Sequence, residues 1–550
     1  MSHVTTTSRG APARASAAQH DNARILVVLL CSLFFLEGVL FIPYVGIQND
    51  EVLFAGAIYP PWGVQHSIRF FGHTFPTMLL SYVGTLKAWI YRVAVFSVVP
   101  PSPWSVRIPV LLIGAITIWM FFEFVVGWAG LRAALVATAL LATDVTYILT
   151  TCLDWGPVVL QHFLLIGGAL LLLRFHRWGK VLDLGAGFFL FGLGLWDKAL
   201  FSWALTGLAA ATAVVCRRAL FRKFTPRNLA AAALGLVLGA APLLVYNRSS
   251  RLSTVGENVQ LSSARFGHKV TILRNSLEGS SLFGYIVRDE ATLQPEEPRN
   301  EVERLSLFLS EATGHRQAGF LWFACILAFA LLPWLWNTPA RKTMLFALIF
   351  VAATWLQMAL TQKGGNGAHH TVLLWPFPHL FAAAALAQIS RFWPRAGVPA
   401  LVAVTTLICG SNLLVLNEHF AQLAERGTTI AWTDAIYPLS RYLSGAGAAH
   451  VYTTDWGIYD ALRALNQGRL PLELGADWFL RNTEKKLPAE ALAAPGAIFV
   501  GHTENNEIQA GTAAGFEALA ESAHLHKHFI KVIDDRNGRP IFEIFRFSRE

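Results

Sequence analysis

Two adjacent carboxylates, Asp50 and Glu51, directly follow the first long apolar stretch of the chain. That stretch, residues 25–45, has Glu37 as its one charged residue and is long enough to cross a bilayer as a helix. Carboxylates at a membrane–water boundary can remove a proton from a hydroxyl, bind a cation or hold a metal ion. They can also be ordinary solvated residues at a helix end. Their role therefore depends on what the rest of the chain brings to the same boundary.

The composition is that of an integral membrane protein. Of 550 residues, 54% are hydrophobic and 14% are charged, whereas charged residues make up about 25% of a typical soluble domain. The net charge of +9 does not indicate a nucleic-acid partner, because the basic residues lie in short segments between apolar runs. The five cysteines lie in or beside apolar runs without C-x-x-C spacing, which predicts core residues rather than metal ligands or disulfides.

The apolar runs predict a multi-spanning α-helical membrane protein with about eleven spans, some of them shorter than the roughly 20 residues expected of one. The eleven runs are residues 25–45, 108–128, 133–150, 158–173, 182–195, 199–215, 229–246, 318–336, 344–360, 372–389 and 398–416. Arginine and lysine concentrate in every second connecting segment, which is the positive-inside pattern. It predicts a cytoplasmic N-terminus and a C-terminus outside the cytoplasm.

Three segments outside the spans are expected to have distinct roles. Residues 1–24 are polar and predicted to be a disordered cytoplasmic N-terminus. Residues 47–104 form an outer loop, in which residues 75–99 contain Lys87 and Arg92 and several prolines follow. We expect helices lying in the membrane interface there rather than a span. A span at this point would put Asp50 and Asp154 on opposite sides. Residues 247–317 form a second long outer loop.

The tail, residues 417–550, has the composition of a small soluble α/β domain outside the cytoplasm. Residues 451–454 and 497–500 are predicted strands, and residues 458–466 and 513–522 are predicted helices. Residues 531–533 and 540–547 flank an Asp-Arg-Asn-Gly turn, which is typical of a hairpin.

On this topology, charged groups gather at the outer boundary of the spans. They are Asp50, Glu51, Arg107, Asp154 and Lys198, with the segment from Lys363 to His370 nearby. Ionisable groups at membrane depth are costly and usually face the protein interior or a cavity. The pattern favours a polar reaction chamber that opens outward, although Arg107 could also snorkel at a span end and Lys198 could pair with Asp197.

The order of these residues resembles the GT-C membrane glycosyltransferases, specifically the branch with protein O-mannosyltransferases and lipid A aminoarabinose transferases. The shared features, over about residues 25–390, are Asp50-Glu51 after the first span, Phe75-Pro76 in the loop, Ser105-Val106-Arg107, Leu153-Asp154, Lys198 and Trp375-Pro376. The resemblance implies a GT-C-like catalytic domain over residues 25–416. Its reaction would move a sugar from a polyprenyl-phosphate carrier to an extracytoplasmic acceptor, which could be a protein, lipid A or another glycolipid, or a glycan.

The resemblance also implies roles for the site residues. Asp50 would be the base, Glu51 would position the acceptor or its loop, and Asp154 would hold the acceptor or a cation. Phosphate contacts would come from Lys198 and Arg107, with Lys363 and His369 as weaker candidates and His73 in place of a cation that relatives carry before the apolar-Pro pair. Some relatives bind a divalent metal through Glu and His, but no such pair can be assigned here, so a metal remains an open question.

Two other functions fit parts of the sequence. A transporter or flippase of a lipid-linked saccharide would explain many spans with buried charges, and a non-catalytic envelope assembly protein would explain the outer domain. The chain has no duplicated half of the kind that transporters often show, and its carboxylates lie at one boundary. The sequence therefore favours a membrane glycosyltransferase of a bacterial inner membrane.

Overall fold

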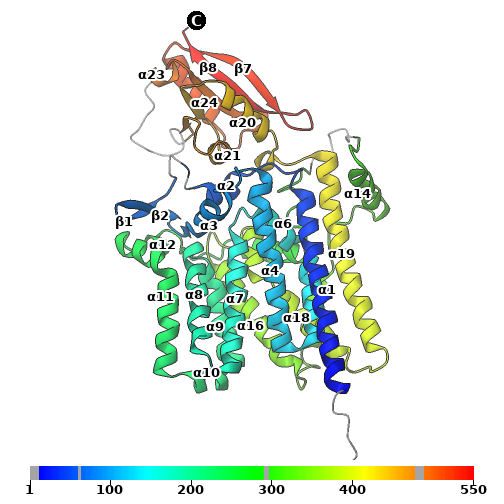
Figure 1. The fold of residues 1–550 in the computed structure, drawn as a ribbon. Helices are drawn as coiled ribbons and strands as arrows, with labels where there is room; N and C mark the ends of the chain where they lie inside the picture. Colours follow the sequence, from blue (N-terminus) through cyan, green and yellow to red (C-terminus); the bar gives the residue numbers. More distant parts are fainter. Residues whose placement is uncertain (1–10, 58, 60–62, 290–296, 477–488, 550) are drawn as a thin grey trace, which may run out of the picture.

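A computed structural model describes residues 11–57, 59, 63–289, 297–476 and 489–549. A bundle of long helices carries a sheet-containing C-terminal domain at one end, the domain end, while the start of α1 and helix α10 lie at the far end (Figure 1). The chain rises through α1 from the far end to the domain end. It returns through α4, and this alternation places each connecting segment at one end or the other.

Six helices are long and apolar enough to cross a membrane. They are α1 (Ala11–Phe41), α4 (Pro103–Ala129), α7 (Val158–Trp178), α11 (Pro226–Ser249), α16 (Ala340–Leu360) and α19 (Gly397–Arg426). The first helix begins at Ala11, so residues 11–24 are helical rather than disordered, and residues 1–10 lie outside the described part. The polar start of α1 continues a helix that the following apolar run stabilises.

Three bent pairs of helices bring the number of candidate spans in the described residues to nine at most. They are α5 (Leu131–Ala142) with α6 (Val145–Leu153), α9 (Phe201–Val215) with α10 (Arg217–Lys223), and α17 (Ala368–Thr371) and η2 (Val372–Leu374) with α18 (Phe377–Ile389). Helices α8 (Val181–Asp197) and α15 (Leu321–Leu331) have 17 and 11 residues, fewer than the roughly 20 expected of a span. Each of the eleven predicted runs contains helix, but eleven spans are not confirmed.

The bend between α5 and α6 is stabilised by a buried polar pair. Asp144 accepts a hydrogen bond from the Tyr147 N–H at 2.7 Å and thereby caps α6, while its other oxygen lies 3.1 Å from His379 Nε2 on α18. Both side chains are almost completely buried. A helix break inside a membrane bundle leaves backbone groups that need such partners.

The outer loop, residues 47–104, differs from the expected set of helices. It contains α2 (Asn49–Gly56), then an antiparallel sheet of β1 (His66–Phe70), β2 (His73–Leu80) and β3 (Val83–Gly84), then α3 (Leu86–Ile90) and the π-helix η1 (Tyr91–Val95). Phe71 and Gly72 both have positive φ and form the two-residue turn of the β1–β2 hairpin. Pro76 therefore lies within a strand. The described residues of the loop stay at the domain end and do not cross the bundle, as expected (Figure 1).

The second long loop packs on the bundle through α12 (Ser253–Gly256), α13 (Phe266–Glu278) and α14 (Glu301–Ala312). Lys269 on α13 is buried, and its Nζ donates hydrogen bonds to the carbonyls of Met358, Ala359 and Thr361 at 3.2, 3.1 and 2.6 Å. A cation placed on the free carbonyls at the end of α16 stabilises that helix terminus. Loop and bundle are therefore joined by specific polar contacts.

The C-terminal domain is the expected α/β domain. Its five-stranded sheet has the order β5-β4-β6-β8-β7, with β5, β4 and β6 parallel and β8 antiparallel to both of its neighbours. The strands are β4 (His450–Thr453), β5 (Leu472–Leu474), β6 (Ala497–His502), β7 (His526–Asp534) and β8 (Pro540–Ser548). The helical elements are η3 (Ile430–Trp432), α20 (Ile436–Gly445), α21 (Tyr459–Leu465), α23 (Ala489–Leu492), η4 (Glu504–Asn506) and α24 (Thr512–Ser522).

The boundary of this domain lies later than predicted, because α19 continues to Arg426 rather than ending before residue 417. The domain also shares a hydrophobic cluster with the outer loop and the start of α4. Ile47, Val52 and Val106 pack with its residues Ile436 and Leu462. The C-terminal domain is therefore docked directly over the segment that carries Asp50.

Candidate active site

The position of Asp50 is set by a capping box at the start of α2. The Gln48 side chain accepts hydrogen bonds from the N–H groups of Asp50 and Glu51 at 2.6 and 3.2 Å, and a Glu51 carboxylate oxygen accepts one from the Gln48 N–H at 3.4 Å. This reciprocal pattern satisfies backbone donors that a helix start leaves without partners. Asp50 and Glu51 therefore lie in the same helical turn, but Glu51 is buried and Asp50 is partly exposed.

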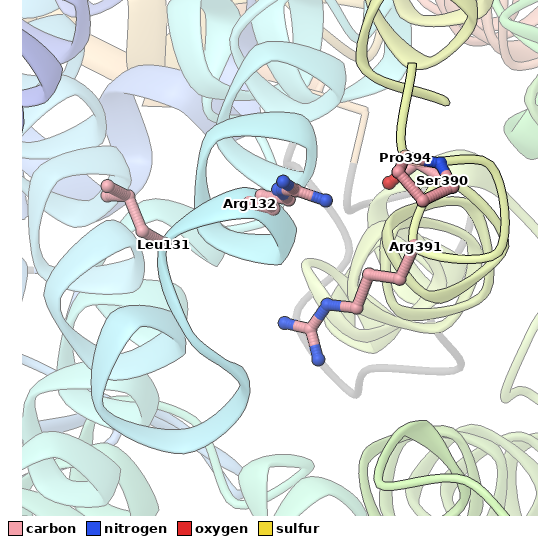
Figure 2. A pocket seen from close by; sticks show the side chains of 5 residues that line it. All are labelled: Leu131, Arg132, Ser390, Arg391 and Pro394. Carbon is pink, nitrogen blue, oxygen red and sulfur yellow. The ribbon is translucent and has the colours of Figure 1, made fainter. Parts of the chain in front are cut away.

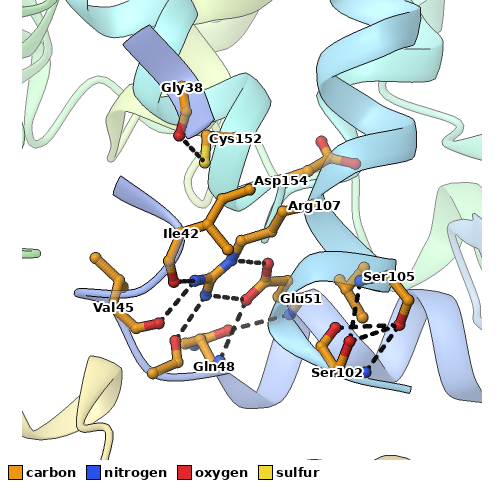
Figure 3. Close-up of polar contacts among 12 residues, drawn as sticks. Gly38, Ile42, Val45, Gln48, Glu51, Ser102, Ser105, Arg107, Cys152 and Asp154 are labelled. Atoms are coloured by element: carbon orange, nitrogen blue, oxygen red, sulfur yellow. Dashed lines mark hydrogen bonds and ion pairs between the residues drawn. The ribbon is translucent and has the colours of Figure 1, made fainter. Parts of the chain in front are cut away.

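Glu51 is fully buried in an ion pair with Arg107 from the first turns of α4 (Figure 3). Nε and one terminal nitrogen of Arg107 donate to the two Glu51 oxygens at 2.8 and 2.9 Å. The remaining N–H groups donate to the carbonyls of Ile42 and Val45, at 3.1 and 2.7 Å, and to that of Gly46 at 2.7 Å. All five donors of the guanidinium group have protein acceptors.

This saturation differs from the phosphate-binding role expected of Arg107. Its donors hold the turn after α1 against the start of α4, and no donor is left for a phosphate oxygen. Both carboxylate oxygens of Glu51 accept hydrogen bonds from Arg107. All five Arg107 donors and both Glu51 oxygens are thus used in contacts between the turn after α1, the start of α2 and α4.

Asp154 is also buried and fully engaged. One of its carboxylate oxygens lies 2.7 Å from Lys87 Nζ, and the other accepts the N–H groups of Val158 and Val159 at 2.8 and 3.1 Å, capping α7. Lys87 comes from α3 in the outer loop and is buried as well. The sequence predicts interfacial helices over residues 75–99 and names no partner for Lys87, whose charge is instead buried against Asp154.

Lys198 is buried but has few partners. Its Nζ donates to the carbonyl of Gly156 at 2.7 Å. Within the described residues no carboxylate lies within 4 Å of Nζ, and Asp197 instead accepts a hydrogen bond from Gln161 at 2.7 Å. The alternative Lys198–Asp197 ion pair is therefore absent there. Burial lowers the pKa of Lys198 to about 8.

Asp50 differs from Glu51 and Asp154 because it is partly exposed and has no cation bound to it among the described residues. Burial raises the pKa of Asp50 to about 6; a hydrogen bond with Asn49 opposes this shift, the negative charge of Asp460 adds to it, and Lys198 lowers it. A carboxylate with this pKa is ionised near neutral pH and basic enough to accept a proton from a hydroxyl.

Asp460 belongs to α21 of the C-terminal domain and was not predicted as a site residue. Its N–H donates to Asn49 Oδ1 at 3.1 Å, and its carboxylate lies 2.6 Å from the Arg463 guanidinium. The docked domain therefore brings a second carboxylate close enough to influence Asp50. No signal in the sequence could have found this contact between segments more than four hundred residues apart.

The weaker candidates for phosphate contact, His369, Lys363 and His73, lie in different surroundings. His369 on α17 packs beside Trp155, with ring centroids 5.7 Å apart, and a Cβ added to Gly156 would lie 2.8 Å from the His369 Cβ. It thus neighbours the Gly156–Lys198 contact. Lys363 and His73 are both exposed, and His73 lies next to the turn of the β1–β2 hairpin. The structure does not bring these two to Lys198.

Metal binding receives no support from the described residues, which contain no group of three or more His, Cys, Asp or Glu side chains arranged around a common point.

Comparisons with known proteins identify the fold. No known protein family and no curated protein matches the chain in sequence. Among solved structures, ArnT from Cupriavidus metallidurans bound to undecaprenyl phosphate superposes with a TM-score of 0.53 at 13% identity, covering 94% of this chain and 97% of that one. Its apo state gives a TM-score of 0.52 at 14% identity, covering 96% and 98%. The apo Archaeoglobus fulgidus oligosaccharyltransferase gives 0.50 at 12% identity, covering 96% of this chain and 74% of that one.

These structures are GT-C glycosyltransferases, and the match to ArnT covers nearly the full length of both chains. The chain therefore has a GT-C-like fold, as the order of its boundary residues predicts. At this level of identity the likeness defines the fold, and the activity must be argued from the site.

Proposed function

We propose that this protein is an inverting membrane glycosyltransferase that uses a polyprenyl-phosphate sugar. The observation that carries the proposal is a pair of neighbouring groups at the domain end of a GT-C-like bundle. One is Asp50, a partly exposed carboxylate whose pKa is raised to about 6, and the other is Lys198, a buried cation with unused hydrogen-bond donors. They supply a base and a phosphate-binding charge.

In the proposed reaction, the acceptor hydroxyl gives its proton to the Asp50 carboxylate as its oxygen attacks the anomeric carbon of the sugar. The bond between that carbon and the phosphate oxygen breaks, and the polyprenyl phosphate leaves with the electron pair. Attack opposite to the leaving group inverts the anomeric configuration. Lys198 stabilises the charge that develops on the phosphate, with His369 beside it.

The buried ion pairs provide the framework for this step. Glu51–Arg107 holds the start of α2, and Lys87–Asp154 holds the turn that leads to Gly156, the hydrogen-bond partner of Lys198. Positioning groups of this kind matter because small displacements of reacting groups are costly in rate. Asp154 thus acts through Lys87 and the start of α7 rather than on the acceptor.

The acceptor side is formed by the C-terminal domain. Asp460 faces Asp50 through Asn49, so an acceptor hydroxyl that reaches Asp50 passes close to α21. The proposal places the domain end outside the cytoplasm of a bacterial inner membrane, with the far end and its basic residues inside. The acceptor is a protein, a glycolipid such as lipid A, or a glycan.

The test uses the protein purified in its own lipids, wild type beside Asp50→Asn, with co-purifying lipids identified by mass spectrometry. We expect a polyprenyl-phosphate sugar in both preparations. Single-turnover release of polyprenyl phosphate should be about 10²–10⁴-fold slower in the variant, because Asn cannot accept the proton. Asp534→Asn, an exposed change in the same domain end, serves as the matched control.

Near-normal transfer by Asp50→Asn would remove Asp50 as the base. Movement of the intact lipid-linked sugar across the membrane, without its cleavage, would instead identify a flippase.

A further inference from the structure

A second polar site lies at the far end of the bundle, away from Asp50. A pocket of about 540 Å³ opens there between the start of α5 and the turn that follows α18. Its lining consists of Leu131, Arg132, Ser390, Arg391 and Pro394 (Figure 2). The volume is within the range of about 300–1,000 Å³ that is typical of small-molecule sites.

Two cations from different helical segments line this pocket. Figure 2 shows the guanidinium groups of Arg132 and Arg391 directed toward the same space. Within the described part of the chain, neither guanidinium has a hydrogen-bond acceptor or a carboxylate within 4 Å. Ser390 is buried, and its hydroxyl donates to the carbonyl of Ala387 at 2.8 Å, so the polar edge of the pocket is dominated by the two arginines.

This arrangement differs from that of Arg24 and Arg174 at the same end, while Arg217 and Arg218 on α10 also have no carboxylate partner among the described residues but line no pocket. Arg24 lies 3.6 Å from Glu123 and Arg174 lies 3.7 Å from Asp183, so each has a carboxylate partner. In the pocket, the exposed side chains of Arg132 and Arg391 place two positive charges beside one space without a carboxylate among the described residues. An anion in that space would be attracted by both charges.

The start of α5 adds to the positive potential. Its first residues follow Gly130, which has no side chain to cap the helix, so the first N–H groups have no capping side chain. The partial positive charge of a helix N-terminus favours anions. This contribution supplements the two arginines and does not define the site by itself.

We propose that the pocket binds a phosphate group, held by Arg132 and Arg391 together. The planar guanidinium fork matches phosphate oxygens in a two-pronged geometry. The pocket lies at the ends of α5 and α18, each of which is part of a candidate membrane span. Basic pockets between membrane helices bind anionic headgroups. An anionic phospholipid is therefore one source of the phosphate, and free phosphate is the other. This proposal does not depend on the glycosyltransferase activity.

The experiment counts phosphatidylglycerol molecules retained by the full-length protein in mild detergent, using native mass spectrometry over a titration. The compared proteins are wild type, Arg132→Gln, Arg391→Gln and the double variant. Each arginine close to an anionic lipid contributes a factor of about five in affinity. We therefore expect about fivefold weaker retention of one lipid in each single variant and about 30-fold weaker retention in the double variant.

The matched control is the double variant Arg217→Gln with Arg218→Gln. It removes two exposed charges from α10 at the same end but outside the pocket, and it should keep the lipid. A parallel arm titrates inorganic phosphate alone. Binding of phosphate but not lipid, with the same dependence on Arg132 and Arg391, would support the site with a soluble source. Equal retention in the wild type and the pocket double variant, or equal losses in the pocket and control double variants, would overturn the proposal.

Unfolding temperatures in neutral phosphatidylcholine should agree among all variants. This measurement separates loss of the site from loss of folding.

Discussion

Arg107 and Lys198 are both buried cations at the domain end, but their surroundings differ. Arg107 places its five N–H donors on Glu51 and on three backbone carbonyls, whereas Lys198 places one donor on Gly156. A saturated cation can only hold its neighbours in place. A cation with unused donors is available to a ligand. The family resemblance implies phosphate contacts for both residues. Among the described residues only Lys198 keeps donors without a protein acceptor.

The largest effect on stability is expected from Glu51→Ala, which changes the surroundings of Arg107. It leaves the Arg107 charge buried without its carboxylate and removes part of the capping box of α2. Removing one partner of a buried ion pair costs about 3–5 kcal/mol. We therefore expect a strong fall in the yield of monodisperse protein and in its unfolding temperature, measured in detergent.

The control for this prediction is Arg304→Gln, which breaks an exposed pair with Glu301. It should leave folding unchanged, because exposed pairs contribute little. A Glu51→Ala protein that unfolds like the wild type but no longer transfers sugar would show instead that Glu51 takes part in the chemistry.

The second prediction concerns Lys198, the buried cation with one hydrogen bond. Lys198→Met keeps the apolar stem but removes the charge, so folding should persist while transfer falls about 10²–10³-fold, the usual loss for one stabilising donor. The measurement is single-turnover release of polyprenyl phosphate beside an unfolding curve. Lys180→Met, at an exposed lysine between α7 and α8, is the matched control. Unchanged transfer in Lys198→Met would remove Lys198 from the site.

The third and smallest effect is a shift in pH dependence. Transfer needs Asp50 ionised, so kcat/KM should rise as the pH passes the Asp50 pKa of about 6. It should fall as Lys198 loses its proton near its pKa of about 8. The Asp460 charge raises the pKa of Asp50, so Asp460→Asn should move the acid limb to lower pH. Loss of the Lys198 charge should move it to higher pH.

Other groups close to Asp50 do not change these signs. Tyr82 and Tyr285 lie near enough for their phenol pKa values to be raised, chiefly by burial and further by Asp50, so both stay neutral in this range. Arg463 forms an ion pair with Asp460 at 2.6 Å. The control is Asp534→Asn, which should leave the acid limb of the kcat/KM–pH curve unchanged. If Asp460→Asn also leaves that limb unchanged, the Asp460 charge does not act on Asp50, and Asp460 only supports the docking of α21.

Much of the fold was predictable because it depends on local patterns. Long apolar runs predict helices wherever they occur, and the strands and hairpin of the C-terminal domain follow from alternation and a turn sequence. The β1–β2 hairpin was missed because its Phe71-Gly72 turn lacks the usual Asn-Gly or Asp-Gly signal and its strands lie between apolar segments. The start of α1 was missed because polar residues at a helix end carry no hydrophobic period.

The sequence by itself determined which residues lie at the domain end, since hydrophobicity and basic charge along the chain set the order of helices and connections. The tertiary structure decided which of those residues are free to react. Lys87 pairs with Asp154 from another segment, Arg107 folds back onto the turn after α1, and the Asp460 N–H donates to Asn49, the neighbour of Asp50, from a segment more than four hundred residues away. The physical reason is that a buried charge is defined by the groups around it, and those groups meet only when the chain has packed.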